Sequence, residues 1–136
     1  NFSLSSPDAL ATRSSASDNG GPGIQFDAVD TAEQNISIDD VFVDPNVDAG
    51  ILIGAADDSL VNVEIIDSEI IDTIDGADVD LFGDGVFLRA SGTAELNGLV
   101  ADNIITGNEG SGFRAKAVES ADLDFDLPLA WGRTVR

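Results

Sequence analysis

The sequence predicts an all-β fold, a parallel β-helix of about four coils, and three observations support this prediction. A glycine followed by a large apolar residue recurs at spacings of 27, 35 and 27 residues. After each of these glycines apolar and polar residues alternate, which is the period of a half-buried strand. Asp outnumbers Glu by twenty to six, and Asp, Gly and Asn are residues of turns rather than of helix surfaces.

The repeat is explicit when each coil is counted from its glycine. The four coils start at Gly23-Ile24, Gly50-Ile51, Gly85-Val86 and Gly112-Phe113. The fifth residue after the glycine is alanine in every coil: Ala28, Ala55, Ala90 and Ala117. The twelfth is polar in every coil: Asn35, Asn62, Asn97 and Asp124. This agreement predicts a 27-residue repeat with one coil of 35 residues.

Each coil contains three short segments with the pattern of strands. The first follows the glycine, the second includes "NISI" and "NVEI", and the third includes "DVFVD", "SEIID" and "NIIT". We expect each segment to pair with its counterpart in the next coil, about 4.8 Å away. The alternative is a β-sandwich built from hairpins, but hairpins require no fixed register between distant segments.

The column of Asn residues has two interpretations. Stacked Asn side chains in successive coils can hydrogen-bond to one another as an amide ladder, and we expect such a ladder to end at Asp124. The alternative is a row of ligands or glycosylation acceptors, since Asn35-Ile36-Ser37 and Asn1-Phe2-Ser3 fit the acceptor pattern.

Two flanking segments are predicted to lie outside the β-helix of residues 23–127. Residues 1–22 are rich in Ser, Gly, Asp and Pro, and we interpret them as an N-terminal arm or cap. Residues 128–136 contain the only Trp and form a C-terminal tail or cap. Because open strand edges recruit further strands, we expect the ends to meet across subunits through Phe2, Leu4, Trp131 and Val135.

The composition excludes several classes of function. The 136 residues include 26 acidic and 6 basic ones, for a formal net charge of −20. Such a surface repels phosphate backbones and anionic lipids, so we expect no nucleic-acid binding and no membrane insertion. Cysteine and histidine are absent, which excludes disulfides and removes the usual general base at neutral pH.

The longest coil contains eight extra residues within "DTIDGADVDLFGDG". Five carboxylates gather there: Asp72, Asp75, Asp78, Asp80 and Asp84. Calcium takes several oxygen ligands from a flexible loop, but Phe82 stands where the EF-hand pattern requires an oxygen. We therefore favour a solvated loop with no cofactor, and calcium is the alternative.

A small group of basic residues is the other candidate site. Arg89 and Lys116 hold the same place in successive coils, so they should stack outward, and Arg114 lies beside them. These three residues could face the carboxylates of an anionic glycan. The alternative is that they pair with neighbouring Asp residues on an acidic surface.

The segment "DGVFLRASGTAELNGLVADNIITGNEGSGFRAKA" resembles the right-handed parallel β-helix repeats of the pectate-lyase-like superfamily. The resemblance covers about residues 23–127 and implies a right-handed coil and an extracellular or cell-surface location. Members include polysaccharide lyases and hydrolases, phage tailspikes and repetitive bacterial surface proteins. The lyases use acidic residues to hold calcium and an Arg or Lys as base, but four coils stack to only about 19 Å, which is short for a polysaccharide groove.

We therefore expect a non-enzymatic structural module of an extracellular filament, sheath or surface stalk. In this interpretation the module assembles with copies of itself by end-to-end stacking of its coils. Two alternatives remain open at this point. One is a carbohydrate-binding or polysaccharide-cleaving fragment, and the other is a calcium-dependent adhesin module.

Overall fold

The computed structural model describes residues 8–77 and 81–127 of the chain. This part of the chain forms thirteen β-strands and no helix, and the strands belong to three sheets. Sheet I contains β1 (Asp8–Thr12), β4 (Glu33–Asp39), β7 (Leu60–Ile66), β10 (Glu95–Ala101) and β13 (Asp122–Asp126). Sheet II contains β2 (Ser15–Ala16), β5 (Phe42–Val43), β8 (Glu69–Ile71) and β11 (Ile104–Thr106). Sheet III contains β3 (Ile24–Ala28), β6 (Ala49–Ala55), β9 (Asp84–Ala90) and β12 (Phe113–Ala117).

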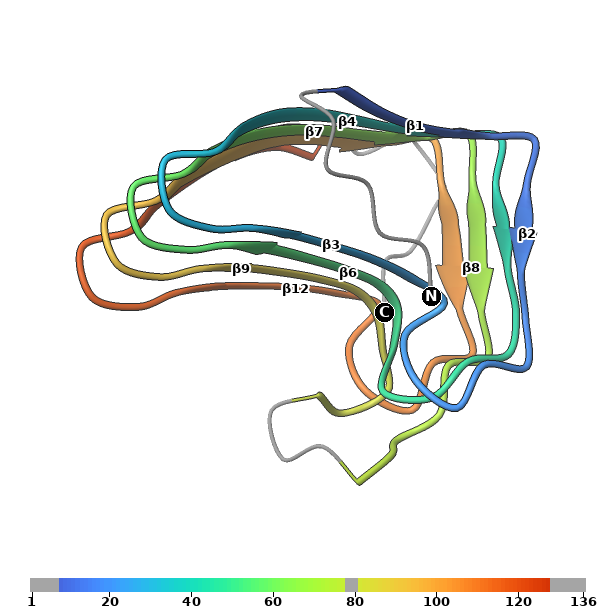
Figure 1. The fold of residues 1–136 in the computed structure, drawn as a ribbon. Coiled ribbons are helices and arrows are strands. Elements are labelled where there is room, and N and C mark those ends of the chain that lie inside the picture. Colours follow the sequence, from blue (N-terminus) through green and yellow to red (C-terminus); the bar gives the residue numbers. More distant parts are fainter. Residues whose placement is uncertain (1–7, 78–80, 128–136) are drawn as a thin grey trace.

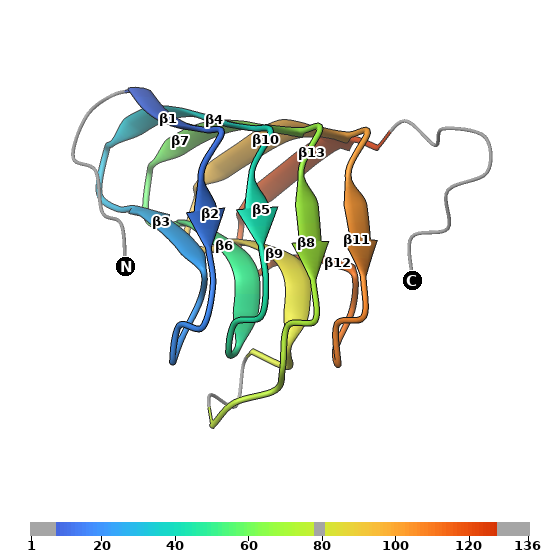
Figure 2. The same cartoon turned by 90° about the vertical axis from the view of Figure 1, so that its right-hand side faces the viewer.

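The chain passes through sheets I, II and III in turn and then returns to sheet I, one strand further along. All the strand pairs are parallel. Figure 1 views this arrangement along its axis, and Figure 2 shows β2, β5, β8 and β11 side by side in order along it. The described residues therefore form an all-β structure of the parallel β-solenoid type rather than a sandwich of hairpins.

The strand register places aligned residues on neighbouring strands. Ala28 pairs with Ala55, Ala55 with Ala90, and Ala90 with Ala117. The first three of these alanines are buried at the end of sheet III, beside the turn that leads back to sheet I. A small side chain suits this position because the chain reverses direction there and the two sheets converge.

The core lies between the three sheets and follows the alternation of the strands. Every second residue of a strand points inward, and these inward rows are made of Ile, Val, Leu, Phe and Ala. The rows along sheets I, II and III include the fully buried side chains of Val61, Ile65, Ile70, Ile53 and Leu88. Burial of these stacked apolar rows is the main force that holds the coils together.

The turns explain why the chain is so rich in Asp. Among the described residues ten non-glycine positions have a positive φ angle, and eight of them are Asp. Asp tolerates this left-handed conformation better than most residues because its short carboxylate can bond locally to the backbone. Much of the negative charge is therefore a consequence of how the corners turn.

Residues 8–16 contribute strands to two of the sheets. We expected residues 1–22 to form an arm or cap, and β1 and β2 within this segment pair with β4 and β5. Residues 1–7 and 128–136 lie outside the described part of the chain. The described residues also include no helix long and apolar enough to span a bilayer.

In the segment between β8 and β9, of which residues 72–77 and 81–83 are described, Leu81 covers part of the outer face of sheet III. Leu81 is buried and packs with Ala49, Leu52 and Phe87 in a second apolar cluster outside the main core. Ile74 and Phe82 are exposed. The prediction of a solvated loop thus fits the exposed Ile74 and Phe82 but does not fit Leu81, which packs against the sheet.

Candidate functional site

Arg114 on β12 contacts Asp84 on β9 and two aromatic rings, one of which, Phe82, belongs to the segment between β8 and β9. Its Nη2 lies 2.6 Å from Oδ2 of Asp84, whose side chain is 1% exposed. Its guanidinium carbon lies 3.8 Å from the ring centre of Phe87 and 4.9 Å from that of Phe82. The other oxygen of Asp84 accepts a hydrogen bond from the backbone N–H of Ser111 at 2.9 Å.

This arrangement changes the interpretation of two candidate residues. We considered Arg114 as a glycan ligand and Asp84 as a calcium ligand. In the structure each is the ionic partner of the other, and two aromatic rings flank the guanidinium. The pair has a structural role, because it closes the outer cluster around Leu81 and Phe87.

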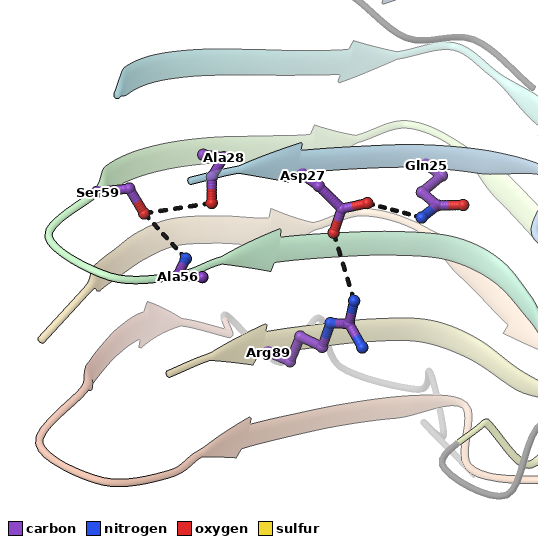
Figure 3. Close-up of polar contacts among 6 residues, drawn as sticks. All are labelled: Gln25, Asp27, Ala28, Ala56, Ser59 and Arg89. Atoms are coloured by element: carbon purple, nitrogen blue, oxygen red, sulfur yellow. Dashed lines mark hydrogen bonds and ion pairs between the residues drawn. The ribbon is translucent and has the colours of Figure 1, made fainter. Parts of the chain in front are cut away.

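Arg89 pairs with Asp27 on a strand two places away. The distance from Nη2 of Arg89 to Oδ1 of Asp27 is 3.5 Å (Figure 3). The residue between them in the register is Gly54, and a Cβ at that position would collide with the Asp27 carboxylate. Gln25 donates a hydrogen bond to Oδ2 of Asp27 at 2.7 Å, so both carboxylate oxygens have partners.

A groove of about 390 Å³ runs over this part of sheet III. We call it the sheet III groove, and its lining includes Asp27, Arg89, Lys116, Val29 and Val118. Lys116 pairs in register with Arg89, as the spacing predicted. Two of the three predicted basic residues therefore line one groove, with exposed valines beside them, while Arg114 is held away from it in its pair.

The column of Asn residues forms hydrogen bonds along sheet I. The amide of Asn62 donates to Oδ1 of Asn35 at 3.1 Å, and that of Asn97 donates to Oδ1 of Asn62 at 3.5 Å. Asp124 follows in register beside Asn97. These contacts give the Asn residues a structural role in joining successive strands.

A second ladder of Asn side chains, which was not predicted, lies at the corner between sheets II and III. Asn19 donates to Oδ1 of Asn46 at 2.7 Å, and Asn46 donates to the carbonyl of Ala16 at 2.9 Å. Two coils beyond Asn46, Oδ1 of Asn108 accepts a hydrogen bond from the backbone N–H of Thr73 at 3.0 Å. Asn19, Asn46 and Asn108 each lie the same number of residues before a glycine that opens a repeat. The spacing of the repeat therefore also contains the signal for this ladder.

The side chain of Ser59, which is buried, closes the turn after β6 (Figure 3). Ser59 accepts a hydrogen bond from the backbone N–H of Ala56 at 3.0 Å, and its hydroxyl lies 3.5 Å from the carbonyl oxygen of Ala28. The hydroxyl thus joins two successive coils at the corner next to the sheet III groove.

A row of carboxylates occupies the corner between sheets I and II. Asp40, Asp67 and Asp102 follow β4, β7 and β10 directly, and all three have positive φ angles. Together with Glu69 they line a groove of about 300 Å³. At the N-terminal end of the row Arg13 lies 3.7 Å from Asp40, with both side chains largely exposed, so this pair stabilises the fold little.

The remaining candidate residues are not brought together in the described part of the chain. Asp78 and Asp80 of the calcium hypothesis lie outside it, as do Phe2, Leu4, Trp131 and Val135 of the assembly hypothesis. Asp72 and Asp75 are exposed. Across residues 8–77 and 81–127 no group of three or more acidic side chains is placed to hold a metal ion.

The C-terminal end of the solenoid exposes apolar side chains over the core. Phe113 and Phe125 pack edge to face, with ring centres 6.1 Å apart, and both are only partly buried. Leu123 is partly buried and Leu127 is exposed. Among residues 8–77 and 81–127, the last strand of each sheet pairs with a neighbour on one side only, and an open strand edge recruits further strands.

These features define the class of the protein as an all-β parallel solenoid whose neighbouring coils are joined by ion pairs and amide ladders. No protein-family model, no curated protein and no solved structure matches the chain. Function must therefore be inferred from the geometry of the chain itself.

Proposed function

We propose that this chain is a non-enzymatic structural module of an extracellular filament, sheath or surface stalk, which assembles by end-to-end stacking. The observation that carries the proposal is the C-terminal end of the solenoid, where Phe113, Leu123 and Phe125 stand beside open strand edges. A solenoid must cover its last coil or stack it on another. Stacking on a second copy would cover these apolar side chains and pair the last strand of sheet I.

We further propose that the solenoid is a right-handed β-helix of about four coils, of the pectate-lyase-like type. Partners in sheet III lie 27 residues apart between β3 and β6, and again between β9 and β12. The pair of β6 and β9 spans 35 residues. Connections between parallel strands of one sheet are right-handed in about 98% of cases, which supports the proposed hand.

The ion pairs on sheet III favour a structural role. Arg114 is engaged by Asp84, and Arg89 by Asp27. With the pair of Arg13 and Asp40, three of the six basic residues bind carboxylates of the same chain, which supports a structural role for them. The charge of −20 makes two copies repel each other, and salt screens this repulsion within about 8 Å at 0.15 M. An extracellular, salt-containing medium therefore suits the proposed assembly.

Light scattering coupled to size-exclusion chromatography tests the proposal directly. We expect the mass to rise with protein concentration and with salt, and electron microscopy should show rods of constant width. A mass that stays at one chain, 14.1 kDa, at every concentration and salt would contradict stacking.

A second candidate function is the binding of an anionic glycan in the sheet III groove. The observation that favours it is the presence of Arg89 and Lys116 in one groove of about 390 Å³. Replacing both with alanine should abolish glycan binding if this candidate is right, whereas Arg13→Ala on another face should leave it unchanged. No binding to a panel of uronic-acid and sulfated glycans would dismiss it.

A further inference from the structure

Two rows of side chains along the solenoid carry opposite charges at their two ends. The first, which we call the Asp27 row, runs through Asp27, Gly54, Arg89 and Lys116 in strand register. It begins with a carboxylate at the N-terminal end and finishes with two cations at the C-terminal end.

The second row has the reverse polarity. This Arg13 row runs through Arg13, Asp40, Asp67 and Asp102, which follow successive strands of sheet I. It begins with a guanidinium at the N-terminal end, and its last member among the described residues is the carboxylate of Asp102. If a second copy is placed beyond the C-terminal end of the first by translation along the solenoid axis, unlike charges therefore face each other in both rows.

The number of strands fixes how two such copies can meet. Sheet I has five described strands, and sheets II and III have four each. Suppose that β1 of a second copy pairs with β13 of the first. In sheets II and III a gap the width of one strand then separates the last strand of the first copy from the first strand of the second. Lys116 and Asp27 of the second copy are then two spacings apart, about 9.6 Å between backbones. Arg89 spans this same separation when it reaches Asp27 within one chain.

The apolar residues at the two edges also differ in size in a complementary way. Continuing the register of sheet I places Leu127 opposite Ala11 of the second copy, because both align with the column of Ile38 and Ile65. A large residue facing a small one fills the core without a clash. Two C-terminal ends that met each other would instead crowd the large residues of β13 together.

We propose that the partner at each end is a second copy of this chain in head-to-tail orientation, with β1 of one copy on β13 of the next, and that the two charge rows select this polarity. The inference rests on the proposed stacking function and specifies its geometry. Contact between two like ends would turn one copy over, so the strands would meet antiparallel and neither row would continue.

Charge reversal at each end tests the polarity. Lys116→Glu places a carboxylate opposite Asp27 of the next copy, and Asp27→Lys places a cation opposite Lys116. We expect each variant alone to raise the concentration for half assembly by about tenfold or more, since like charges oppose each other across the contact. An equimolar mixture should assemble nearly as well as the wild type, because each altered end then meets a compatible one.

Two controls separate polarity from other effects. Asp27→Asn removes the internal pair with Arg89 without presenting a cation, and Glu64→Lys makes the same charge change on β7, in the middle of the solenoid. Both should assemble far better than Asp27→Lys, and circular dichroism should show that all variants are folded. If the wild type assembles but the mixture does not recover, the head-to-tail inference fails alone. If the wild type does not assemble, the proposed function fails with it.

Discussion

Arg89 contacts Asp27 across the strand that lies between them, with 3.5 Å between Nη2 and Oδ1. This contact is possible because Gly54 has no side chain at the intervening position. The three residues were aligned in one column by spacing alone, and the structure places them in one row. The row therefore links a sequence pattern to a specific interaction between coils.

Gly54→Ala should destabilise the fold. The new Cβ would collide with the Asp27 carboxylate and lie 3.3 Å from Nε of Arg89, and overpacking of this kind costs about 1–3 kcal/mol. The free energy of unfolding in urea measures the effect. Gly20→Ala is the matched control, because a Cβ there meets nothing within 4 Å. Equal stability of the two variants would show that the row is not tightly packed at Gly54.

Arg114→Ala should destabilise the protein by about 3 kcal/mol, since it leaves a buried carboxylate without its ionic partner. Asp84 is 1% exposed, so water cannot replace the lost contact fully. Adding Asp84→Asn to this variant should recover part of the loss, because the buried charge is then removed. Arg13→Ala is the control and should change stability by less than about 0.5 kcal/mol, since its pair is exposed. Equal losses in the two Arg variants would argue against the role assigned to Arg114.

Thr73→Asn should stabilise the fold by about 1 kcal/mol through added hydrogen bonds. Thr73 is fully buried, its hydroxyl has no hydrogen-bond partner, and it occupies the place held by Asn46 and Asn108 in adjacent coils. An amide there can repeat the bonds that those residues make to the neighbouring coil. A higher midpoint of urea unfolding is expected, with Thr106→Asn on the exposed face as control. A lower midpoint would mean that the corner has no room for the larger side chain.

Asp67→Asn should stabilise the fold at low salt by about 0.5 kcal/mol, and the gain should fade above about 0.5 M salt. Asp67 lies between Asp40 and Asp102, so its charge is repelled from both sides, and Asn also tolerates the positive φ of 48° found there. Asp18→Asn is the control. Asp18 also has a positive φ angle, but its backbone N–H donates a hydrogen bond to the carbonyl of Pro45, a residue without charge, and it is not a member of the Arg13 row. Equal gains in both variants would point to net charge rather than to the row.

The regular parts of the fold could be predicted because a solenoid repeats its environment. Ala55, Asn62 and Lys116 each have counterparts in the same setting one coil away, so spacing alone revealed their neighbours. The strands β1 and β2 were not predicted, because they precede the first glycine that opens a repeat. Most of their residues are also small or polar, so they lack the apolar pattern of the other strands.

The position of the segment between β8 and β9 could not be predicted for a different reason. An insertion has no counterpart in the other coils, so its length does not indicate which face it covers. Leu81 decides this by packing on the outer side of sheet III. Beside this cluster Arg114 of the predicted basic group and Asp84 of the predicted calcium ligands form an ion pair, and their assignment to ligand sites stays a prediction.

Disulfide trapping tests the central claim most directly, because the chain has no cysteine of its own. Leu10 in β1 and Asp126 in β13 occupy the same position across sheet I, because the strand register aligns both with Ser37, Glu64 and Leu99 of the strands between them. Both side chains are exposed. In a head-to-tail stack Leu10 of one copy therefore lies beside Asp126 of the next. The variant carrying both Leu10→Cys and Asp126→Cys should give a ladder of multimers on a non-reducing gel, and the two single variants should link only when mixed. Monomers alone, or dimers formed by either single variant, would contradict the account.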